Sequence, residues 1–215
     1  MSDYFSVFDL PRKLQVDEEG LRRRFYELSR RHHPDFHQLA SGAEQASALE
    51  SSALINRAYR ALRDPIARVE YLVALEEGRD HRSAESDRSG AGRSGREVRD
   101  GAATRPKPPR DLLEEMLEVQ EALEEAKATG LDEAARAHLA GERRRLVDRR
   151  EAIDAEVVRR GAEWDAAVDE GRHRAPLLAW FKEALAARAY LGTVIDDLGQ
   201  ALGEGQEAHV SHRRH

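Results

Sequence analysis

Residues 78–109 divide the chain in two, because this segment has almost nothing that a folded core could bury. It contains one Val and no Leu, Ile, Met, Phe, Tyr or Trp. Without apolar side chains to bury, folding cannot offset the loss of conformational entropy. We therefore predict a flexible linker at 78–109 between a first domain at 1–77 and a second at 110–201. The polar end of the chain, 202–215, is predicted to be a disordered tail.

The two regions beside the linker carry the apolar spacing of helices. In the first of them, Leu21, Phe25 and Leu28 recur at i, i+4 and i+7, which places them on one helix face. Aromatic residues make up only 6% of the chain, so its cores must be built mostly from aliphatic side chains. Together with the high charged content, this composition favours helices over strands. We expect an all-α protein.

Short polar caps and prolines set the expected helix ends of the first domain. Ser41, with Glu44 three residues later, has the spacing of a capping box. The two long helices should form an antiparallel hairpin with residues 33–37 at its turn. The expected helices run over 4–10, from Asp17 to Pro34, from Ser41 to Asp64 and over about 66–75.

The turn of this hairpin reads His33-Pro34-Asp35-Phe36-His37, and three interpretations are open. A Pro between polar neighbours can simply stop a helix. His33 and His37 could hold a metal ion, although Pro34 prevents the helical geometry that would aim both imidazoles at one ion. The third interpretation is the His-Pro-Asp signature of J domains.

The surroundings of the turn favour the third interpretation, because residues 1–75 resemble J domains in both order and spacing. The residues that carry the likeness are Asp3, Tyr4, Phe5, Phe8 and Leu10 before the turn and Ile55, Ala58, Tyr59, Leu62, Asp64, Arg68 and Tyr71 after it. The resemblance implies a helical hairpin with short flanking helices. It also implies a co-chaperone that binds the ATPase domain of a DnaK-type chaperone and stimulates its ATP hydrolysis.

In such a protein, His33, Pro34 and Asp35 are implied to contact the chaperone. Pro34 would hold the loop in one shape, and the short Asp35 carboxylate suits a charge-assisted bond to a cation of the ATPase domain. The preceding helix would add a basic surface that an acidic docking surface attracts, although a charge run is also common on an ordinary solvated face. Its arginines are Arg22, Arg23, Arg24, Arg30 and Arg31.

Several features are similar to the HscB co-chaperones of iron–sulfur cluster assembly. Phe36 follows the tripeptide and Leu72 follows Tyr71, where general J proteins usually place Lys and Asp. Segments 112–121 and 164–167 also resemble that family. The resemblance implies an HscA-like partner chaperone and an IscU-type scaffold protein as the client.

The second domain is expected to be a three-helix bundle. Its first helix has a core stripe through Leu112, Met116, Val119, Leu123 and Ala126. Leu113 and Leu117 lie off this stripe and could form either a partner surface or the edge of a wider buried face. A second helix is expected at about 132–160.

The third helix of the bundle contains Trp180 and Phe181, and Gly171 and Pro176 predict a break or irregular turn before it. The HscB resemblance implies that the first bundle helix and an aromatic residue of the last one hold the client. The implied client-binding residues are Leu113, Leu117, Glu118 and Glu121, with Trp180 or Phe181 opposite.

Other function classes find little support. A net charge of −6 argues against a nucleic-acid-coating protein, and no apolar stretch is long enough to span a membrane. The chain has no Cys, phosphate-binding Gly-rich loop or nucleophile motif, so we expect no enzyme, no cofactor and no metal site in a cytoplasmic protein. A J protein for another client remains open. So does a coiled-coil-like structural or DNA-associated regulator, although Gly141 and Gly161 interrupt any heptad pattern.

Overall fold

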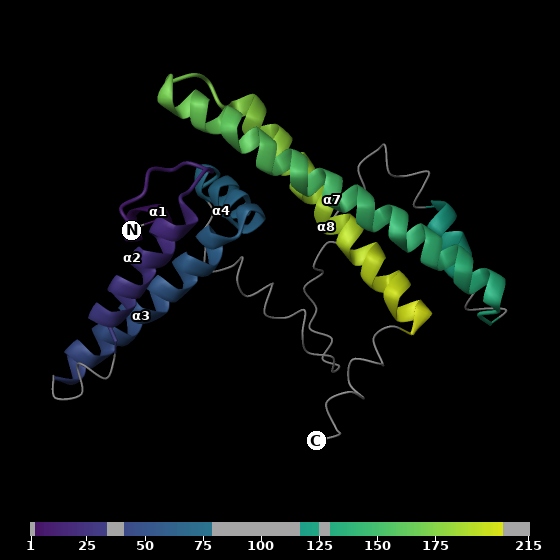
Figure 1. The fold of residues 1–215 in the computed structure, drawn as a ribbon, viewed down its shortest axis with the longest axis horizontal. Helices are drawn as coiled ribbons and strands as arrows, with labels where there is room; N and C mark the ends of the chain where they lie inside the picture. The colour runs from purple at the N-terminus through teal and green to yellow at the C-terminus, as the bar shows by residue number, and fades with distance from the viewer. Residues whose placement is uncertain (1–2, 34–40, 79–116, 125–129, 204–215) are drawn as a thin grey trace. The chain divides into compact units, whose positions relative to one another are not determined.

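The computed structural model describes residues 3–33, 41–78, 117–124 and 130–203 (Figure 1). Within these ranges all regular secondary structure is helical, which confirms the expected all-α class. The chain forms two compact units: unit 1 comprises Met1–Glu97 and Val157–Phe181, and unit 2 comprises Val98–Glu156 and Lys182–His215. None of the helices described has the length and apolar character that crossing a bilayer requires.

The N-terminal helices of unit 1 begin where local polar caps predict. The Asp17 carboxylate accepts a bond from the backbone N–H of Glu19, and Ser41 and Glu44 form the predicted capping box. Asp64 ends one helix and caps the next by accepting from the backbone N–H of Ala67 at 2.7 Å. These helices are α1 (Tyr4–Val7), α2 (Glu18–Arg31), α3 (Gly42–Arg63) and α4 (Pro65–Glu76).

Helix α1 ends three residues earlier than predicted. Asp9 adopts a left-handed φ of 55°, and the backbone N–H of Leu10 donates to the Phe5 carbonyl at 2.9 Å. The Asp9 N–H donates to the Ser6 carbonyl in the same turn, which completes a Schellman motif. The prediction that this helix runs to Leu10 was wrong, because the last carbonyls are already satisfied before the chain reaches Pro11.

Helices α2 and α3 lie side by side and carry the core of the first domain (Figure 1). Leu21 of α2 and Leu62 of α3 are buried, and the rings of Phe25 and Tyr59 stack with centroids 4.1 Å apart. Helix α1 packs against α3, and its Tyr4 ring stacks on that of Tyr71. The predicted hairpin is therefore present, with short helices flanking it.

Tyr71 makes the stability of this core sensitive to alkaline pH. Its hydroxyl accepts a bond from the backbone N–H of Tyr4 at 2.8 Å, and burial raises the pKa of Tyr71 to about 12. A tyrosine in the unfolded chain titrates near pH 10, so the folded chain binds this proton more tightly between about pH 10 and 12. Stability that is present below about pH 10 should therefore be lost as the pH rises towards 12.

We expect Tyr71→Phe to remove this alkaline loss, which is worth up to about 2–3 kcal/mol in the wild type. Denaturant unfolding of both proteins at pH 9, 10 and 11 would measure about half of this loss, the part that falls below pH 11. The variant itself should be less stable at neutral pH, since the Tyr4 N–H loses its acceptor. Parallel stability curves for the two proteins across this range would show that Tyr71 is not the group responsible.

Two long helices follow, α7 (Glu133–Asp169) and α8 (Ala175–Leu202). The predicted break near Gly171 is the turn between them, where Gly171 has a φ of 62° that favours glycine. Pro176 is the second residue of α8, where a missing N–H costs little. The prediction that the second bundle helix ends at about 160 was wrong, because α7 continues through Gly161 for nine further residues to Asp169.

Unit 2 has one apolar core shared by three helical segments, which are residues 117–124 and parts of α7 and α8. Arg188 of α8 donates to Asp154 of α7 at 2.6 Å at the side of this core. The three-segment arrangement agrees with the expected bundle. Its most buried members are Val119, Leu139, Leu146, Leu191, Ile195 and Leu198.

Candidate chaperone-binding site

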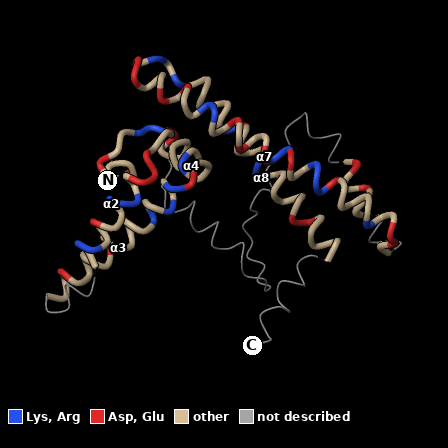
Figure 2. The backbone as a smooth tube through the Cα atoms, in the orientation of Figure 1, with Lys and Arg blue, Asp and Glu red and all other residues tan. Residues whose placement is uncertain are grey.

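Helix α2 packs on α3, and Lys and Arg positions recur along it (Figure 2). Leu21 is only 2% exposed, whereas every candidate arginine of the helix is exposed. The 3.6-residue turn accounts for this separation, since the apolar stripe faces the partner helix and the intervening positions do not. The exposed arginines are Arg22, Arg23, Arg24, Arg30 and Arg31.

Acidic neighbours engage two of these arginines. Arg23 lies 3.7 Å from Asp17 and 3.8 Å from Glu19. Arg24 forms an ion pair with Asp9, in the turn that ends α1. Each pair is exposed and contributes little to stability, but it reduces the positive charge that a partner would meet. No ion pair within the described ranges involves Arg22, Arg30 or Arg31.

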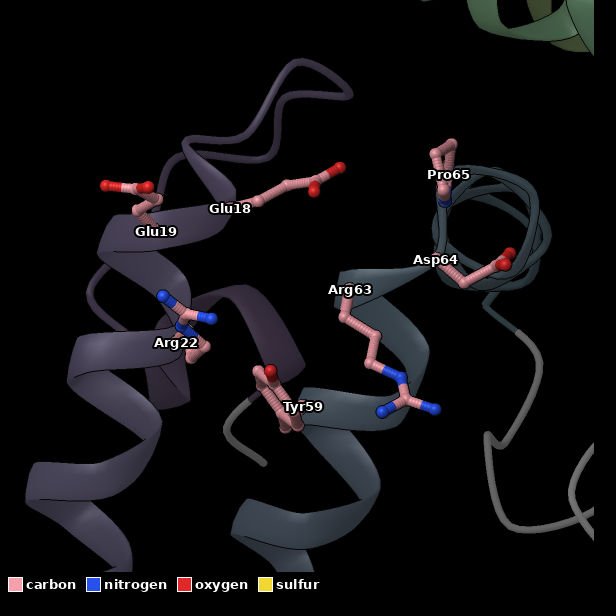
Figure 3. A pocket seen from close by; sticks show the side chains of 7 residues that line it. All are labelled: Glu18, Glu19, Arg22, Tyr59, Arg63, Asp64 and Pro65. Carbon is pink, nitrogen blue, oxygen red and sulfur yellow. The ribbon is translucent and has the colours of Figure 1, made fainter.

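An open groove of about 510 Å³ lies beside Arg22, at the N-terminal end of α2 (Figure 3). Tyr59 and Arg63 border it from α3, and the Arg63 guanidinium carbon lies 5.9 Å from the centre of the Tyr59 ring. Side chains of both charges line the groove, so it favours neither an anionic nor a cationic ligand. Its lining residues are Glu18, Glu19, Arg22, Tyr59, Arg63, Asp64 and Pro65.

The His-Pro-Asp turn follows directly on α2. His33 is exposed, one residue after His32 caps the helix. Pro34 and Asp35 lie outside the described residues, and so does His37. Of the turn, His33 alone belongs to the described residues, and it follows directly on the arginine-bearing helix.

The loop that leads into α2 is held by two buried charged groups. The Asp165 carboxylate of α7 accepts bonds from the backbone N–H groups of Leu14 at 2.7 Å and Gln15 at 2.8 Å. Arg68 of α4 donates to the Leu14 carbonyl at 2.5 Å and to the Leu62 carbonyl at 2.6 Å. The backbone N–H and C=O of Leu14 thus link a buried anion to a buried cation, although Nη2 of Arg68 is buried without a hydrogen-bond partner among the described residues.

Burial also shifts the titration of both groups. It raises the pKa of Asp165, although the two backbone N–H bonds oppose the shift. It lowers the pKa of the Arg68 guanidinium, although Glu18, Asp64 and Asp165 oppose that shift. The hydrogen bonds therefore compensate only part of the cost of desolvating the carboxylate.

Residues around Asp165 complete the contact of the loop with α7. Trp164 is fully buried, and its indole N–H donates to the Arg12 carbonyl at 3.4 Å. Lys13 forms an ion pair with Asp169 at 2.6 Å. A Cβ atom on Gly161 would lie 3.2 Å from the Leu14 Cβ, so glycine permits this close approach. The sequence pattern did not indicate that residues 157–181 pack with the first domain.

The implied client residues of the first bundle helix lie at its surface where they are described. Leu117 is 57% exposed, whereas Val119 and Leu123 of the predicted core stripe are buried. Glu118 and Glu121 are also exposed. Leu113 lies outside the described residues.

The two implied aromatic residues differ in accessibility. Phe181 is fully buried, and its ring packs edge-on against those of Trp164 and Trp180. Trp180 is partly exposed, with the Arg160 guanidinium carbon 4.1 Å from its ring centre. Only Trp180 therefore offers surface that a client could contact. Adjacent positions on a helix point about 100° apart, which explains the difference.

Comparison with known proteins identifies the N-terminal part. Residues 3–71 match the family model described as the DnaJ domain. The chain contains a J domain. It spans α1 to α4 up to Tyr71, which confirms the resemblance seen in the residues on both sides of the turn.

Two solved structures are similar to the J domain together with the rest of the chain. Chaperone HscB from Vibrio cholerae has 23% sequence identity and a TM-score of 0.53, and the match covers 96% of this chain and 99% of that one. The human co-chaperone protein HscB has 24% identity and a TM-score of 0.53, with coverage of 93% and 82%. The likeness confirms that this J-domain chain has an HscB-type fold.

Proposed function

We propose that this J-domain protein is a non-enzymatic co-chaperone for iron–sulfur cluster assembly. It binds an IscU-type scaffold protein, delivers it to a DnaK-type, HscA-like chaperone and stimulates the ATPase of that chaperone. The observation that carries the proposal is a J domain set within a fold that is similar to an HscB chaperone over 96% of the chain.

The J domain supplies the chaperone-binding half of the function. The chain places His33, Pro34 and Asp35 at the end of the arginine-bearing α2. A cationic helix speeds the approach to an acidic surface, and the Asp35 carboxylate, which follows it in the sequence, can then bond one cation of the ATPase domain. Steering and activation are therefore separate tasks of neighbouring residues.

The first bundle helix supplies the client-binding half. Leu117 exposes apolar surface while Val119 and Leu123 fill the core of unit 2, so Leu117 is available to a partner. Glu118 and Glu121 provide a polar rim of negative charge, and a polar rim is usual around an apolar contact. Leu113 has the same register four residues earlier, and Trp180 is the aromatic residue that we retain for the client.

We expect Leu117→Ala to weaken scaffold binding by roughly ten- to a hundredfold, since a well-buried leucine at an interface is worth roughly 1.5–3 kcal/mol. Thermal stability should change little because the side chain is mostly exposed. Leu123→Ala is the matched control on the same helix segment, since that leucine is 8% exposed. The control should lower the melting temperature clearly. Calorimetric titration with scaffold would measure the first effect, and unchanged affinity would remove Leu117 from the client surface.

The whole proposal is tested by the steady-state ATPase of candidate DnaK-type chaperones with this protein, with scaffold, and with both together. We expect stimulation by the protein alone and a further increase when scaffold is added. Stimulation without any effect of scaffold would point to a J protein for another client. No stimulation of any candidate chaperone would refute the proposal.

A further inference from the structure

We propose that residues 105–110 of this chain, which read Arg-Pro-Lys-Pro-Pro-Arg, dock in a groove of unit 1 beside Val158 of α7. The groove has a volume of about 420 Å³, and all the residues that line it belong to unit 1. It is distinct from the groove beside Arg22, and the inference does not depend on the proposed function. The segment itself lies outside the described residues.

The walls of the groove are mostly aliphatic. They come from the loop before α2, from the first half of α4 and from the part of α7 that belongs to unit 1. Val158 is 48% exposed, so the groove offers apolar surface to an occupant. Ligand sites run from about 300 to 1,000 Å³, so this one suits a few residues and not a long segment. The aliphatic lining residues are Val16, Pro65, Val69, Val157 and Val158.

A buried guanidinium adds one polar requirement to this apolar groove. Arg68 is among the lining residues and is only 3% exposed. Its Nε and Nη1 donate to the carbonyls of Leu62 and Leu14, whereas Nη2 has no hydrogen-bond partner in the described part of the chain. A buried donor without a partner is costly, so the best occupant offers an acceptor to Nη2.

The charges around the groove disfavour an anionic occupant. Glu18, Asp64 and Asp165 already interact with the charge of Arg68. Asp17 and Glu18 also line the groove and are exposed. The acceptor for Nη2 should therefore be a neutral carbonyl, and the occupant should carry positive charge on either side of it.

The end of the predicted linker has this chemistry. Three of the residues 105–110 are prolines, which supply apolar rings, and the other three are cations. Such a sequence favours polyproline II, whose backbone carbonyls have no internal partner, and each Pro lacks an N–H that would need one. One carbonyl is thus available to Nη2 of Arg68, and the cations suit Asp17 and Glu18. A preformed conformation also loses little entropy on docking.

The chain is long enough to bring this segment to the groove. The helices of the first domain end before Gly78, and Arg105 follows 27 residues later. At about 1.5 Å per residue, the axis of α4 from Gly78 back to Pro65 measures roughly 20 Å. A random-coil chain of 27 residues spans about 30 Å. Tethering at this range gives an effective concentration of about millimolar, so even a weak contact would be occupied.

The experiment uses the full chain, which has no Cys and so gives no background in thiol cross-linking. Thr104→Cys places a thiol beside the segment. Ala162→Cys places the other beside the groove, because Ala162 is exposed one helical turn after Val158. The readout is the rate at which a short bismaleimide links the two thiols within one chain, followed by gel electrophoresis. Val158→Lys is then added to this pair, and Ala152→Lys, at another exposed position of α7, is the matched control.

We expect Val158→Lys to slow the cross-linking by about fivefold or more, because the new cation removes apolar contact and repels the cationic segment. Ala152→Lys adds the same charge outside the groove and should change the rate less than about twofold. Melting temperatures measured in parallel would show that both variants are folded.

Variants of the segment test the same contact while leaving every groove residue unchanged. Arg105→Glu/Lys107→Glu should slow the cross-linking by about fivefold or more and remove its dependence on salt. Arg93→Glu/Arg99→Glu makes the same change in charge elsewhere in the linker and should leave the rate close to that of the parent pair. These variants keep the test decisive if Val158→Lys proves unstable.

Two results would overturn the inference. One is an equal rate for the groove variant and its control, together with an equal rate for the two segment variants. The other is a main product with the mass of two chains, which would show that a second copy occupies the groove. Neither result involves the chaperone ATPase, so the proposed function is tested separately.

Discussion

Asp165→Ala is expected to lower the free energy of unfolding of unit 1 by about 2–4 kcal/mol. The substitution leaves the backbone N–H groups of Leu14 and Gln15 without their acceptor. It also removes a negative charge that interacts with the buried Arg68. The desolvation that raises the pKa of Asp165 offsets part of its contribution, so we expect less than the full cost of two unsatisfied donors.

Tryptophan fluorescence can follow this unfolding, since the two tryptophans of the chain, Trp164 and Trp180, both belong to unit 1. Asp169→Ala is the matched control. It removes a carboxylate one helical turn later, whose side chain is 60% exposed and pairs with Lys13. That exposed pair should be worth less than about 1 kcal/mol. Equal losses for the two variants would show that the contact made by Asp165 does not hold the loop before α2.

Asp35→Asn is expected to abolish stimulation of the chaperone ATPase, returning the rate to that of the chaperone alone. The substitution keeps the shape of the side chain but removes the charge that would bond a cation of the partner. Helicity and melting temperature should not change, because the sequence places Asp35 in the turn after α2 and not in a core stripe. Steady-state ATPase measurements and circular dichroism of the same samples would check both expectations.

A suitable control for charge is Glu50→Gln, which removes a carboxylate from the exposed surface of α3. This variant should stimulate the chaperone like the wild type. Stimulation that survives in Asp35→Asn would contradict the proposed role of the turn. Loss of stimulation in both variants would instead indicate a general effect of charge.

The helix starts of the J domain could be predicted because their causes are local. Asp17, Ser41 and Asp64 each bond a backbone N–H two or three residues away, so the signal lies within a few positions of sequence. The end of α7 could not be predicted in the same way. Glycine usually weakens a helix, so Gly161 suggested a helix end. Its place inside α7 is explained by the close approach of Leu14, which is far away in the sequence.

The candidate site was predictable in its position but not in its detail. The turn and the five arginines follow from the His-Pro-Asp signature and the residues before it. Which arginines are engaged depends partly on Asp9, which reaches Arg24 only through the tertiary fold. The Arg23–Glu19 pair, at i and i+4, is a signal that the sequence did offer.

The contact between residues 157–181 and the first domain carries almost no sequence signal. Asp165 and Trp164 form hydrogen bonds with backbone atoms of residues 12–15. Every residue type has the same backbone carbonyl, and nearly every type has the same N–H, so the sequence does not identify these partners. The spacing of apolar residues also could not show which of Trp180 and Phe181 is buried. Both are large aromatics on one helix, and only the packing of Trp164 against Phe181 shows which of them is buried.

The most direct test of the central claim is the rate at which ATP already bound to a DnaK-type chaperone is hydrolysed in a single turnover. We predict that the full-length wild-type protein, added in excess over the chaperone, accelerates this step by about tenfold or more and that Asp35→Asn does not. A single-turnover rate that is the same with and without the wild-type protein, for every DnaK-type chaperone of the same cell, would contradict the account.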